Sequence, residues 1–256
     1  MSNPTHPSAP PHHTGPQRVV VVNSKGGSGK TTLATNLAAY LTARGIPTAL
    51  MDYDKQASST QWLTKRPAHC PRLVGVEAFR PTPPNMTRSW FLRVPADTRW
   101  VVSDTPAALD DLHLRQLIAR ADVVLIPVMP SPTDIHAVTR FIERVLIAGR
   151  ARLHQTHIGI VANRVKLNLD LYKTLRRFLD TLGLPIVAQL RDSHHYLQAA
   201  LLGTGVCELP SDHGHCDIEE WNKLAAWLTS KDMDNAPHPQ SEAAPPPPPA
   251  PNPIAA

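Results

Sequence analysis

Residues 19–41 read VVVVNSKGGSGKTTLATNLAAYL and contain the most informative pattern of the chain. Four consecutive valines indicate a strand that is buried on both faces. A glycine-rich segment follows and ends in Lys30 and Thr31, after which apolar residues recur with the period of a helix. This order of strand, glycine-rich turn and helix is typical of a phosphate-binding loop, where backbone N–H groups and a helix N-terminus point at phosphate.

The side chains of this loop suit a nucleoside triphosphate with a metal ion. Glycines allow the backbone to curl around phosphate. Lys30 is expected to neutralise the β- and γ-phosphates, and Thr31 to offer its hydroxyl to Mg²⁺. We therefore expect ATP and Mg²⁺ as ligands. The nucleotide-binding residues expected in the loop are Gly26, Gly27, Ser28, Gly29, Lys30, Thr31 and Thr32.

Apolar, strand-like runs alternate with segments of helical period along the rest of the chain. The expected strands are residues 18–23, 47–52, 73–79, 100–104, 122–128, 157–163 and 185–190. Helices are expected from Lys30, Gln56 and Asp134, around Leu112 and Leu171, and finally over residues 217–231. The alternation predicts an α/β fold of three layers with a doubly wound, mostly parallel sheet. The proline-broken residues 66–95 are expected to form a surface excursion.

Composition limits the class of protein. The 256 residues are 42% hydrophobic, enough for one α/β domain, and the net charge of +5 permits an acidic partner without proving one. Three cysteines without a CxxC pair argue against a disulfide scaffold, a zinc ribbon and an iron–sulfur cluster. No apolar run approaches the roughly 20 residues of a membrane span, and no secretory signal is evident. We expect a cytoplasmic protein.

Proline marks the two ends of the chain. Fourteen of the 27 prolines lie in the first 17 residues or after residue 235. Such segments cannot sustain a helix or a sheet. We expect a disordered Pro/His-rich tail over residues 1–17, an ATPase domain over 18–231 and a disordered Pro-rich tail over 232–256. The second tail is either inert or a docking site for an aromatic-lined groove.

Position 24 distinguishes the loop from the common Walker A pattern. GxxxxGK[ST] needs a glycine there, whereas this chain has Ser24 and carries Lys25 just before the paired glycines. The sequence KGGSGKT resembles the deviant Walker A box of the ParA/MinD family of P-loop NTPases. The resemblance implies that Lys25 reaches across a dimer interface to the partner's nucleotide. The alternative is a solvated basic residue.

The segment MDYDKQASS at residues 51–59 is similar to the DxDPQ segment of that family, with Lys55 in place of the usual proline. By this resemblance Asp54 orients the attacking water. A carboxylate at the carboxyl end of a strand beside a phosphate loop can do so, although Asp54 could instead cap the next helix. The resemblance extends over roughly residues 18–210. The expected catalytic residues are Lys25, Lys30 and Asp54.

Two further segments resemble functional parts of the family. WVVSDTPAAL at residues 100–109 ends an apolar strand in Asp104, which is the usual Walker B arrangement for holding Mg²⁺. VANRV places Asn163 and Arg164 where relatives have an adenine-contacting asparagine, although Asn163 could simply cap a loop. The metal-site residues expected are Thr31, Asp52 and Asp104.

Basic residues are concentrated in the second half of the chain. Between residues 140 and 191 there are ten lysines and arginines against three acids. ParA-like relatives bind DNA without sequence preference through this region, and a surplus of this kind suits contacts with phosphate backbones. A merely solvated basic face is the alternative. The DNA-binding residues expected are Arg164, Lys166, Arg176, Arg177 and Arg191.

The resemblance implies a ParA-type ATPase that forms an ATP-dependent sandwich dimer, binds nucleoid DNA and positions a cargo through an adaptor of the ParB/McdB type. Plasmids, chromosomes, chemoreceptor clusters and carboxysomes are all possible cargoes, and SSTQWLTKRP at residues 58–67 is similar to carboxysome-positioning members. The alternatives are a MinD-like membrane-cycling regulator and a metabolic enzyme of the same superfamily. The final amphipathic helix carries Glu219 and Glu220, which favours docking on the core over lipid. SDHGHCD at residues 211–217 is expected to be a polar surface loop rather than a metal site.

Overall fold

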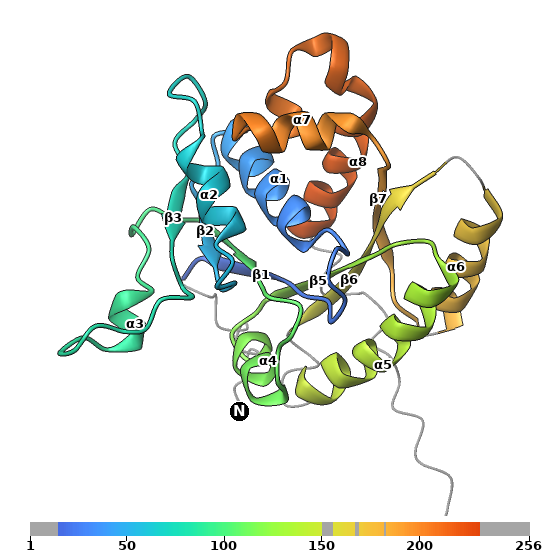
Figure 1. Ribbon diagram of the computed structural model, residues 1–256, viewed down its shortest axis with the longest axis horizontal. Helices are drawn as coiled ribbons and strands as arrows, with labels where there is room; N and C mark the ends of the chain where they lie inside the picture. The colour runs from blue at the N-terminus through green and yellow to red at the C-terminus, as the bar shows by residue number, and fades with distance from the viewer. Residues whose placement is uncertain (1–14, 150–155, 167–168, 182, 231–256) are drawn as a thin grey trace, which may run out of the picture.

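Seven parallel strands form a single sheet in the order β3-β2-β4-β1-β5-β6-β7 (Figure 1). The computed structural model describes residues 15–149, 156–166, 169–181 and 183–230. The strands are β1 (Gln17–Val21), β2 (Thr48–Asp52), β3 (Val74–Val76), β4 (Trp100–Asp104), β5 (Val123–Val128), β6 (His157–Val165) and β7 (Ile186–Arg191). The predicted doubly wound α/β fold is confirmed, and within the described residues the sheet is wholly parallel rather than mostly so.

Helices cover both faces of the sheet, which gives three layers (Figure 1). One face carries α1 (Lys30–Ala43), α2 (Ser58–Thr64), α7 (His194–Leu202), the 3-10 helix η2 (Val206–Glu208) and α8 (Ser211–Thr229). The other face carries α4 (Asp111–Ile118), α5 (Pro132–Gly149) and α6 (Leu169–Thr181). A short helix, α3 (Arg88–Phe91), lies outside these layers in the connection from β3 to β4.

The four consecutive valines at residues 19–22 pack alternately into the two halves of the core. Val19 and Val21 lie in the cluster that contains α1 and α8, whereas Val20 and Val22 lie in the cluster that contains α4, α5 and α6. Burying each valine contributes about 1.5–3 kcal/mol relative to leaving it exposed. A continuous apolar run therefore fixes β1 at the centre of the sheet, where neither face is solvated.

Three helical segments differ from the sequence-based expectation. Helix α2 begins at Ser58 rather than Gln56, because Ala57 takes a left-handed conformation with φ 56° that interrupts the helix. Helix α8 begins at Ser211, so the backbone of residues 211–217 is helical and the expected surface loop is wrong. Gly214 costs about 1 kcal/mol inside a helix, so the helical backbone of this segment runs against the local propensity. Helix α7 was not expected, although Ser193 caps it and Gly203 ends it with φ 70°.

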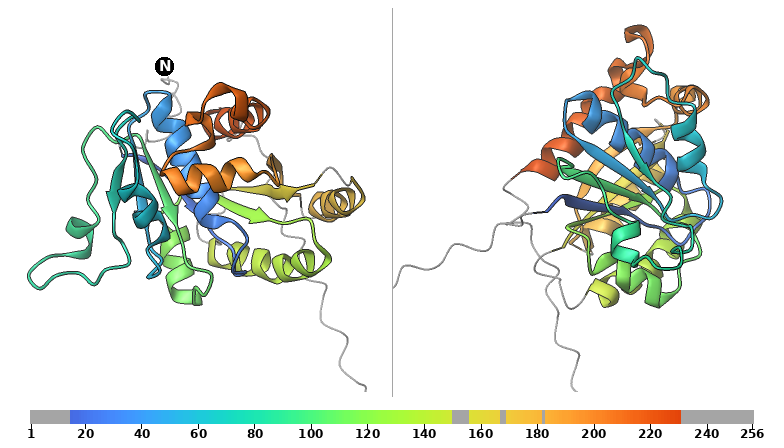
Figure 2. Two further views of the ribbon diagram at one scale, coloured as in Figure 1. Left: turned by 45° about the horizontal axis from the view of Figure 1, so that its top comes forward. Right: turned by 90° about the vertical axis from the view of Figure 1, so that its left-hand side faces the viewer.

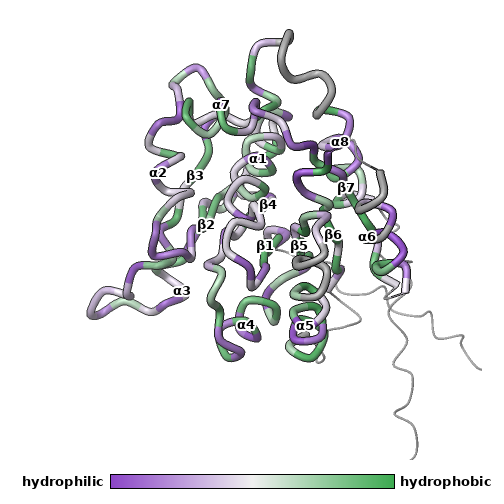
Figure 3. Tube along the Cα trace, turned by 45° about the vertical axis from the view of Figure 1, so that its right-hand side comes forward, coloured by the Kyte–Doolittle hydropathy of each residue, from purple (hydrophilic) through white to green (hydrophobic). Residues whose placement is uncertain are grey.

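The predicted excursion between residues 66 and 95 projects from one end of the sheet (Figure 2). It contains the three-residue edge strand β3 and then α3. In Figure 3 the strands at the centre of the sheet are hydrophobic, while the connection that carries α3 is largely hydrophilic. The expected tails at residues 1–17 and 232–256 fall almost wholly outside the described residues. No helix among the described residues is long and apolar enough to cross a membrane.

Candidate nucleotide-binding site

The candidate site lies at the carboxyl edge of the sheet, where all seven strands end on the same side. The pairing of the strands places Asp104 opposite Val21 on one neighbour and opposite Asp52 on the other. The glycine-rich loop leaves β1 directly after Val21. Both acidic strand ends therefore lie beside the loop, in the position where ligands bind to open parallel sheets.

The backbone of the loop is shaped by glycine at two positions. Gly27 has φ 75° and Gly29 has φ 91°, which are left-handed conformations that other residues adopt only with strain. A Cβ atom added at Gly26 or Gly27 would meet nothing within 4 Å, so this part of the loop surrounds open space. A Cβ at Gly29 would instead lie 2.0 Å from Nδ2 of Asn163. The loop is therefore open on the ligand side and closely packed behind.

A chain of hydrogen bonds fixes the start of the loop. The Asn23 side chain donates to the carbonyl of Pro127 at 2.7 Å and accepts from the backbone N–H of Lys25 at 3.0 Å. The ammonium of Lys30 donates to the carbonyl of Lys25 at 3.2 Å. The backbone of Lys25 is thus held through both its N–H and its carbonyl. Asn23 was not singled out from the sequence, although its place directly after the strand was a usable signal.

Lys30 is a buried cation at the first position of α1, directly after the loop, with 7% of its surface exposed. Burial lowers its pKa from the ordinary value, while the carboxylates of Asp104 and Asp54 oppose that shift. A buried ammonium needs nearby negative charge. The loop therefore presents a site that an anion such as a phosphate would complete.

Asp104 is fully buried at the end of β4. Burial raises the pKa of its carboxyl to about 6, and hydrogen bonds from the hydroxyls of Ser59 and Thr31 oppose this rise. Its Oδ2 accepts from the Ser59 hydroxyl at 2.5 Å, whereas Oδ1 has no hydrogen-bond partner within the described part of the chain. A buried, unpartnered carboxylate oxygen near the hydroxyl of Thr31 matches the hard oxygen ligands that Mg²⁺ prefers.

Asp52 is also buried, and its oxygens are occupied by the protein. Its Oδ2 accepts from both the backbone N–H and the hydroxyl of Thr60, each at 2.9 Å, and its Oδ1 accepts from the N–H of Asp54 at 3.0 Å. Asp52 therefore anchors the start of α2 to the end of β2. The structure shows this anchoring role in addition to the metal role predicted from the sequence, which stays a prediction.

Asp54 lies in a turn between β2 and α2. Its Oδ1 accepts from the N–H of Gln56 at 2.9 Å, and its carbonyl accepts from the N–H of Ala57 at 2.8 Å. The residue that caps α2 is Ala57, so Asp54 is not the helix cap that was its alternative interpretation. The exposed Lys55, which stands where the family has proline, lies inside this turn. The catalytic role of Asp54 stays a prediction.

Asn163 closes the back of the loop at the end of β6 and is 6% exposed. Its amide group donates to the carbonyl of Ser28 at 2.8 Å, and its Oδ1 accepts from the N–H of Arg164 at 3.0 Å. Arg164 has φ 52°, an unusual value for a residue other than glycine. The structure thus gives Asn163 a part in holding the phosphate loop. The adenine contacts of Asn163 and Arg164 stay predictions.

The basic residues predicted to bind DNA divide into two groups. Val165 pairs with Arg191 across β6 and β7, so Arg191 lies near the exposed Arg164 and Lys166 at the carboxyl edge. Lys166 also lies 3.8 Å from the carboxylate of Asp192. The other group, Arg176 and Arg177, is exposed on α6. Helix α6 follows β6 along the chain and covers the face of the sheet that also carries α4 and α5 (Figure 1).

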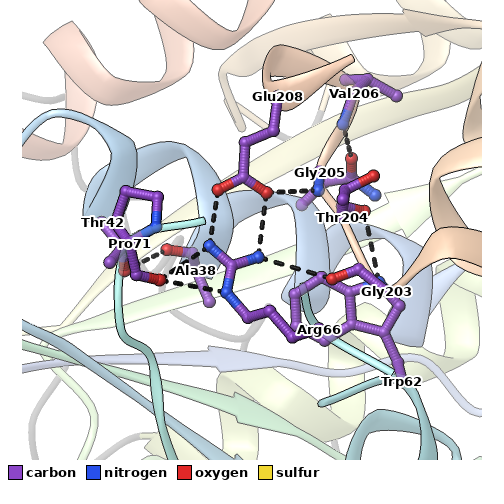
Figure 4. A network of polar contacts seen from close by, with 11 residues as sticks. Ala38, Thr42, Trp62, Arg66, Pro71, Gly203, Thr204, Gly205, Val206 and Glu208 are labelled. Atoms are coloured by element: carbon purple, nitrogen blue, oxygen red, sulfur yellow. Dashed lines mark hydrogen bonds and ion pairs between the residues drawn. The ribbon is translucent and has the colours of Figure 1, made fainter. Parts of the chain in front are cut away.

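A polar network ties the far end of α2 to the segment after α7 (Figure 4). The guanidinium of Arg66 forms a two-pronged ion pair with Glu208, at 2.5 and 2.9 Å, with 6% of each side chain exposed. Glu208 also accepts from the N–H of Gly205 at 2.8 Å, and the indole of Trp62 donates to the carbonyl of Thr204 at 3.2 Å. Helix α2 is therefore fixed at its beginning to the candidate site and beyond its end to η2.

No cluster of three or more metal-ligating side chains occurs among the described residues. The imidazoles of His213 and His215 and the thiol of Cys216 lie outside the described side chains. Cys207 is partly buried, and burial raises the pKa of its thiol to about 12. A thiol of this kind stays protonated and is inert near neutral pH.

Comparison with known proteins agrees with this geometry. Residues 19–204 match the CobQ/CobB/MinD/ParA nucleotide binding domain. The chain belongs to this family. The match covers the loop, Asp54, Asp104 and Asn163, so the predicted ParA/MinD resemblance is confirmed as a family relationship.

Two relatives in this family carry the same name. The chain is 30% identical over 207 residues to maintenance of carboxysome distribution protein A of Halothiobacillus neapolitanus, covering 80% of this chain and 93% of that protein. It is 35% identical over 137 residues to the protein of that name from Gloeobacter kilaueensis, covering 54% of this chain and 60% of that protein.

Solved structures share the fold. Apo McdA from Cyanothece has a TM-score of 0.63 at 18% identity, covering 83% of this chain and 99% of that chain. An ATP complex of a variant of Cyanothece McdA has a TM-score of 0.62 at 18% identity, covering 83% and 96%. The MinD cell division protein of Aquifex aeolicus has a TM-score of 0.60 at 17% identity, again covering 83% and 96%. The chain therefore has the fold of a ParA/MinD-family P-loop NTPase.

Proposed function

We propose that the protein is a ParA-type ATPase that hydrolyses ATP with Mg²⁺ in the loop between β1 and α1. One observation carries this proposal. The buried cation of Lys30 and the unpartnered oxygen of buried Asp104 flank a loop whose glycines open onto free space. Both groups are poorly solvated and lie in the same place. The positive group suits the phosphates of a metal–nucleotide complex, and the negative group suits its metal ion.

Each residue near the loop has a distinct part in that reaction. Loop N–H groups and Lys30 bind the β- and γ-phosphates, and Thr31 and Asp104 would hold the metal ion, which when bound offsets phosphate charge. Asp54, on the turn after β2, orients the attacking water and accepts its proton. Because the N–H of Asp54 is tied to Asp52, the reacting carboxylate is positioned from a buried strand end.

Lys25 acts across a dimer in this proposal. Its peptide is fixed by Asn23 and Lys30, which holds the residue at the rim of the loop. A cation supplied by the facing subunit would stabilise negative charge on the γ-phosphate, so hydrolysis would be coupled to dimerisation. Slow turnover by the isolated protein and faster turnover with an adaptor are part of this proposal.

Nucleoid DNA is the proposed surface on which the dimer acts, and the protein would reside in the cytoplasm. The exposed basic residues of β6, α6 and β7 support sequence-independent contacts with phosphates. The names of the two relatives favour carboxysomes as the cargo, with an adaptor of the McdB type, over plasmids or chromosomes. A MinD-like membrane cycle and a metabolic enzyme remain the rival functions, because the family name covers both.

The test is DNA binding by fluorescence anisotropy with unrelated duplexes, in ATP, in ADP and without nucleotide. Asp54→Ala should bind duplexes only in ATP, regardless of sequence and less tightly as salt rises, because pairing two subunits doubles the phosphate contacts. ATP hydrolysis by Asp54→Ala should fall about 100-fold relative to wild type, because the variant lacks the carboxylate that orients the water. Lys30→Ala should lose both nucleotide and DNA binding.

Charge-removing variants serve as matched controls within this test. Replacing Arg176 and Arg177 together should weaken every duplex equally and leave ATP affinity unchanged. Arg115→Ala, an exposed arginine on α4 outside the basic region, should change neither. Absence of binding to any duplex at low salt would exclude DNA as the surface, and sedimentation with anionic vesicles in ATP would then identify a membrane cycle.

A further inference from the structure

Ser59 lies entirely inside the protein, although it belongs to α2, most of which is at the surface. It is the second residue of that helix, and its hydroxyl points across to the end of β4. The hydroxyl donates to Oδ2 of Asp104 at 2.5 Å. Both partners of this hydrogen bond have 0% of their surface exposed, so water does not compete for it.

The two oxygens of Asp104 therefore have different surroundings. Oδ2 accepts the Ser59 hydroxyl, whereas Oδ1 has no hydrogen-bond partner within the described part of the chain. A hydrogen bond to one carboxylate oxygen restricts rotation of the group and so fixes the direction of the other. Thr31 and Lys30 interact with the same carboxylate from the side of the loop.

The neighbouring residue strengthens this geometry. Thr60 binds Asp52 through its backbone N–H and its hydroxyl, both at 2.9 Å, so the first turn of α2 is attached to the ends of two adjacent strands. Ser59 is thereby held in place by the helix instead of depending on its own hydrogen bond. A side chain supported in this way can orient its partner.

We propose that Ser59 is a positioning residue that aims the free oxygen of Asp104 at the magnesium site. This inference rests on the proposed function, since it assumes that Mg²⁺ binds beside Thr31 and Asp104. It adds a connection between the segment that carries Asp54 and the metal site. A change in α2 would then alter the metal site, and binding of the metal would alter the position of Asp54.

The test measures Mg²⁺ dependence separately from nucleotide affinity. A fluorescent ATP analogue is titrated first with EDTA present, then at fixed analogue with rising Mg²⁺, for the full-length wild type and Ser59→Ala. We expect equal affinity in EDTA and a need for about 10-fold more Mg²⁺ in the variant, the usual effect of losing a residue that orients a metal ligand. Ser59→Thr, which keeps the hydroxyl, should restore the wild-type Mg²⁺ dependence.

Ser58→Ala is the matched control, because Ser58 is the exposed neighbour on the same turn. It should behave like the wild type. If Ser59→Ala does not fold by circular dichroism, Ser59→Cys removes the strong donor with little change in volume and is titrated in its place. An unchanged Mg²⁺ requirement in the folded variant would overturn the positioning role, and equal losses with and without Mg²⁺ would show a purely structural one. Wild-type protein that binds no nucleotide would instead overturn the proposed function.

Discussion

At the residue scale, the site combines charged groups whose burial is unfavourable without a ligand. Asp104 is fully buried and Lys30 is 7% exposed, yet no ion pair joins the two side chains within the described part of the chain. A protein that keeps such groups loses stability in exchange for binding. Removing the charge should therefore stabilise the nucleotide-free protein while destroying the site.

Asp104→Asn tests this trade-off through pH. Burial raises the pKa of Asp104 from 3.8 to about 6, so between these values the folded protein holds a proton that the unfolded chain has released. The wild-type protein therefore loses unfolding free energy as pH rises from 3.8 to about 6, because the buried carboxyl must ionise. This loss persists at higher pH. The variant should gain up to about 3 kcal/mol of unfolding free energy over wild type at about pH 7.5, and almost none at about pH 4.

Urea denaturation at both pH values measures the effect, with Asp97→Asn, an exposed carboxyl, as the control. Mg²⁺-dependent nucleotide binding should be lost in Asp104→Asn alone. A variant that is less stable than wild type at the higher pH would show that the neighbours of Asp104 stabilise its carboxylate by more than burial destabilises it.

Individual residues of the site differed in how far the sequence could predict them. Lys30, Thr31 and Asp104 follow from a local motif, and the structure places them together. The roles of Ser59 and Thr60 did not follow from the segments that contain them, because their partners are Asp104 and Asp52 on two different strands. Such contacts depend on which strands are adjacent, which a sequence pattern does not state.

At the element scale, α2 is the helix on which the site depends most. Its first turn binds two strand ends, and the residues at and beyond its last turn bind the segment between α7 and α8 (Figure 4). The strands themselves were predicted well, because runs of apolar residues buried on both faces are distinctive. The helix starts were predicted less well, because Ala57 and Gly214 act against the simple rules at those places.

The ion pair between Arg66 and Glu208 should be costly to break. Arg66→Ala leaves a carboxylate buried without its partner, which we expect to reduce the unfolding free energy by about 3–5 kcal/mol. Replacing both residues with apolar ones, as Arg66→Met with Glu208→Leu, should cost much less, since no charge stays buried. Urea denaturation of the three proteins gives the comparison.

Lys65→Ala is the control, since Lys65 is the exposed neighbour of Arg66. It should lie within about 0.5 kcal/mol of wild type. If Arg66→Ala were equally mild, the ion pair would be a solvated contact rather than the buried anchor described here.

At the scale of the whole molecule, the carboxyl edge of the sheet carries the nucleotide loop, the Asp54 turn and part of the basic surface. ATP-dependent pairing of two such edges would bring two loops and two basic surfaces together. The sequence predicted the layers and the parallel sheet from alternation alone. It could not predict the position of α7 or the anchoring of α2, which arise from packing between distant segments.

We propose that ATP joins two copies of the chain through this edge, and light scattering of purified Asp54→Ala tests for that dimer. With ATP and Mg²⁺ the mass should be twice the 28.0 kDa of one chain, and with ADP it should be that of one chain. Adding Lys25→Ala to the same protein should abolish the ATP dimer while nucleotide binding persists, because the cation across the interface is lost. If the variant is a monomer with every nucleotide, or if the dimer persists without Lys25, ATP does not join two copies through this edge.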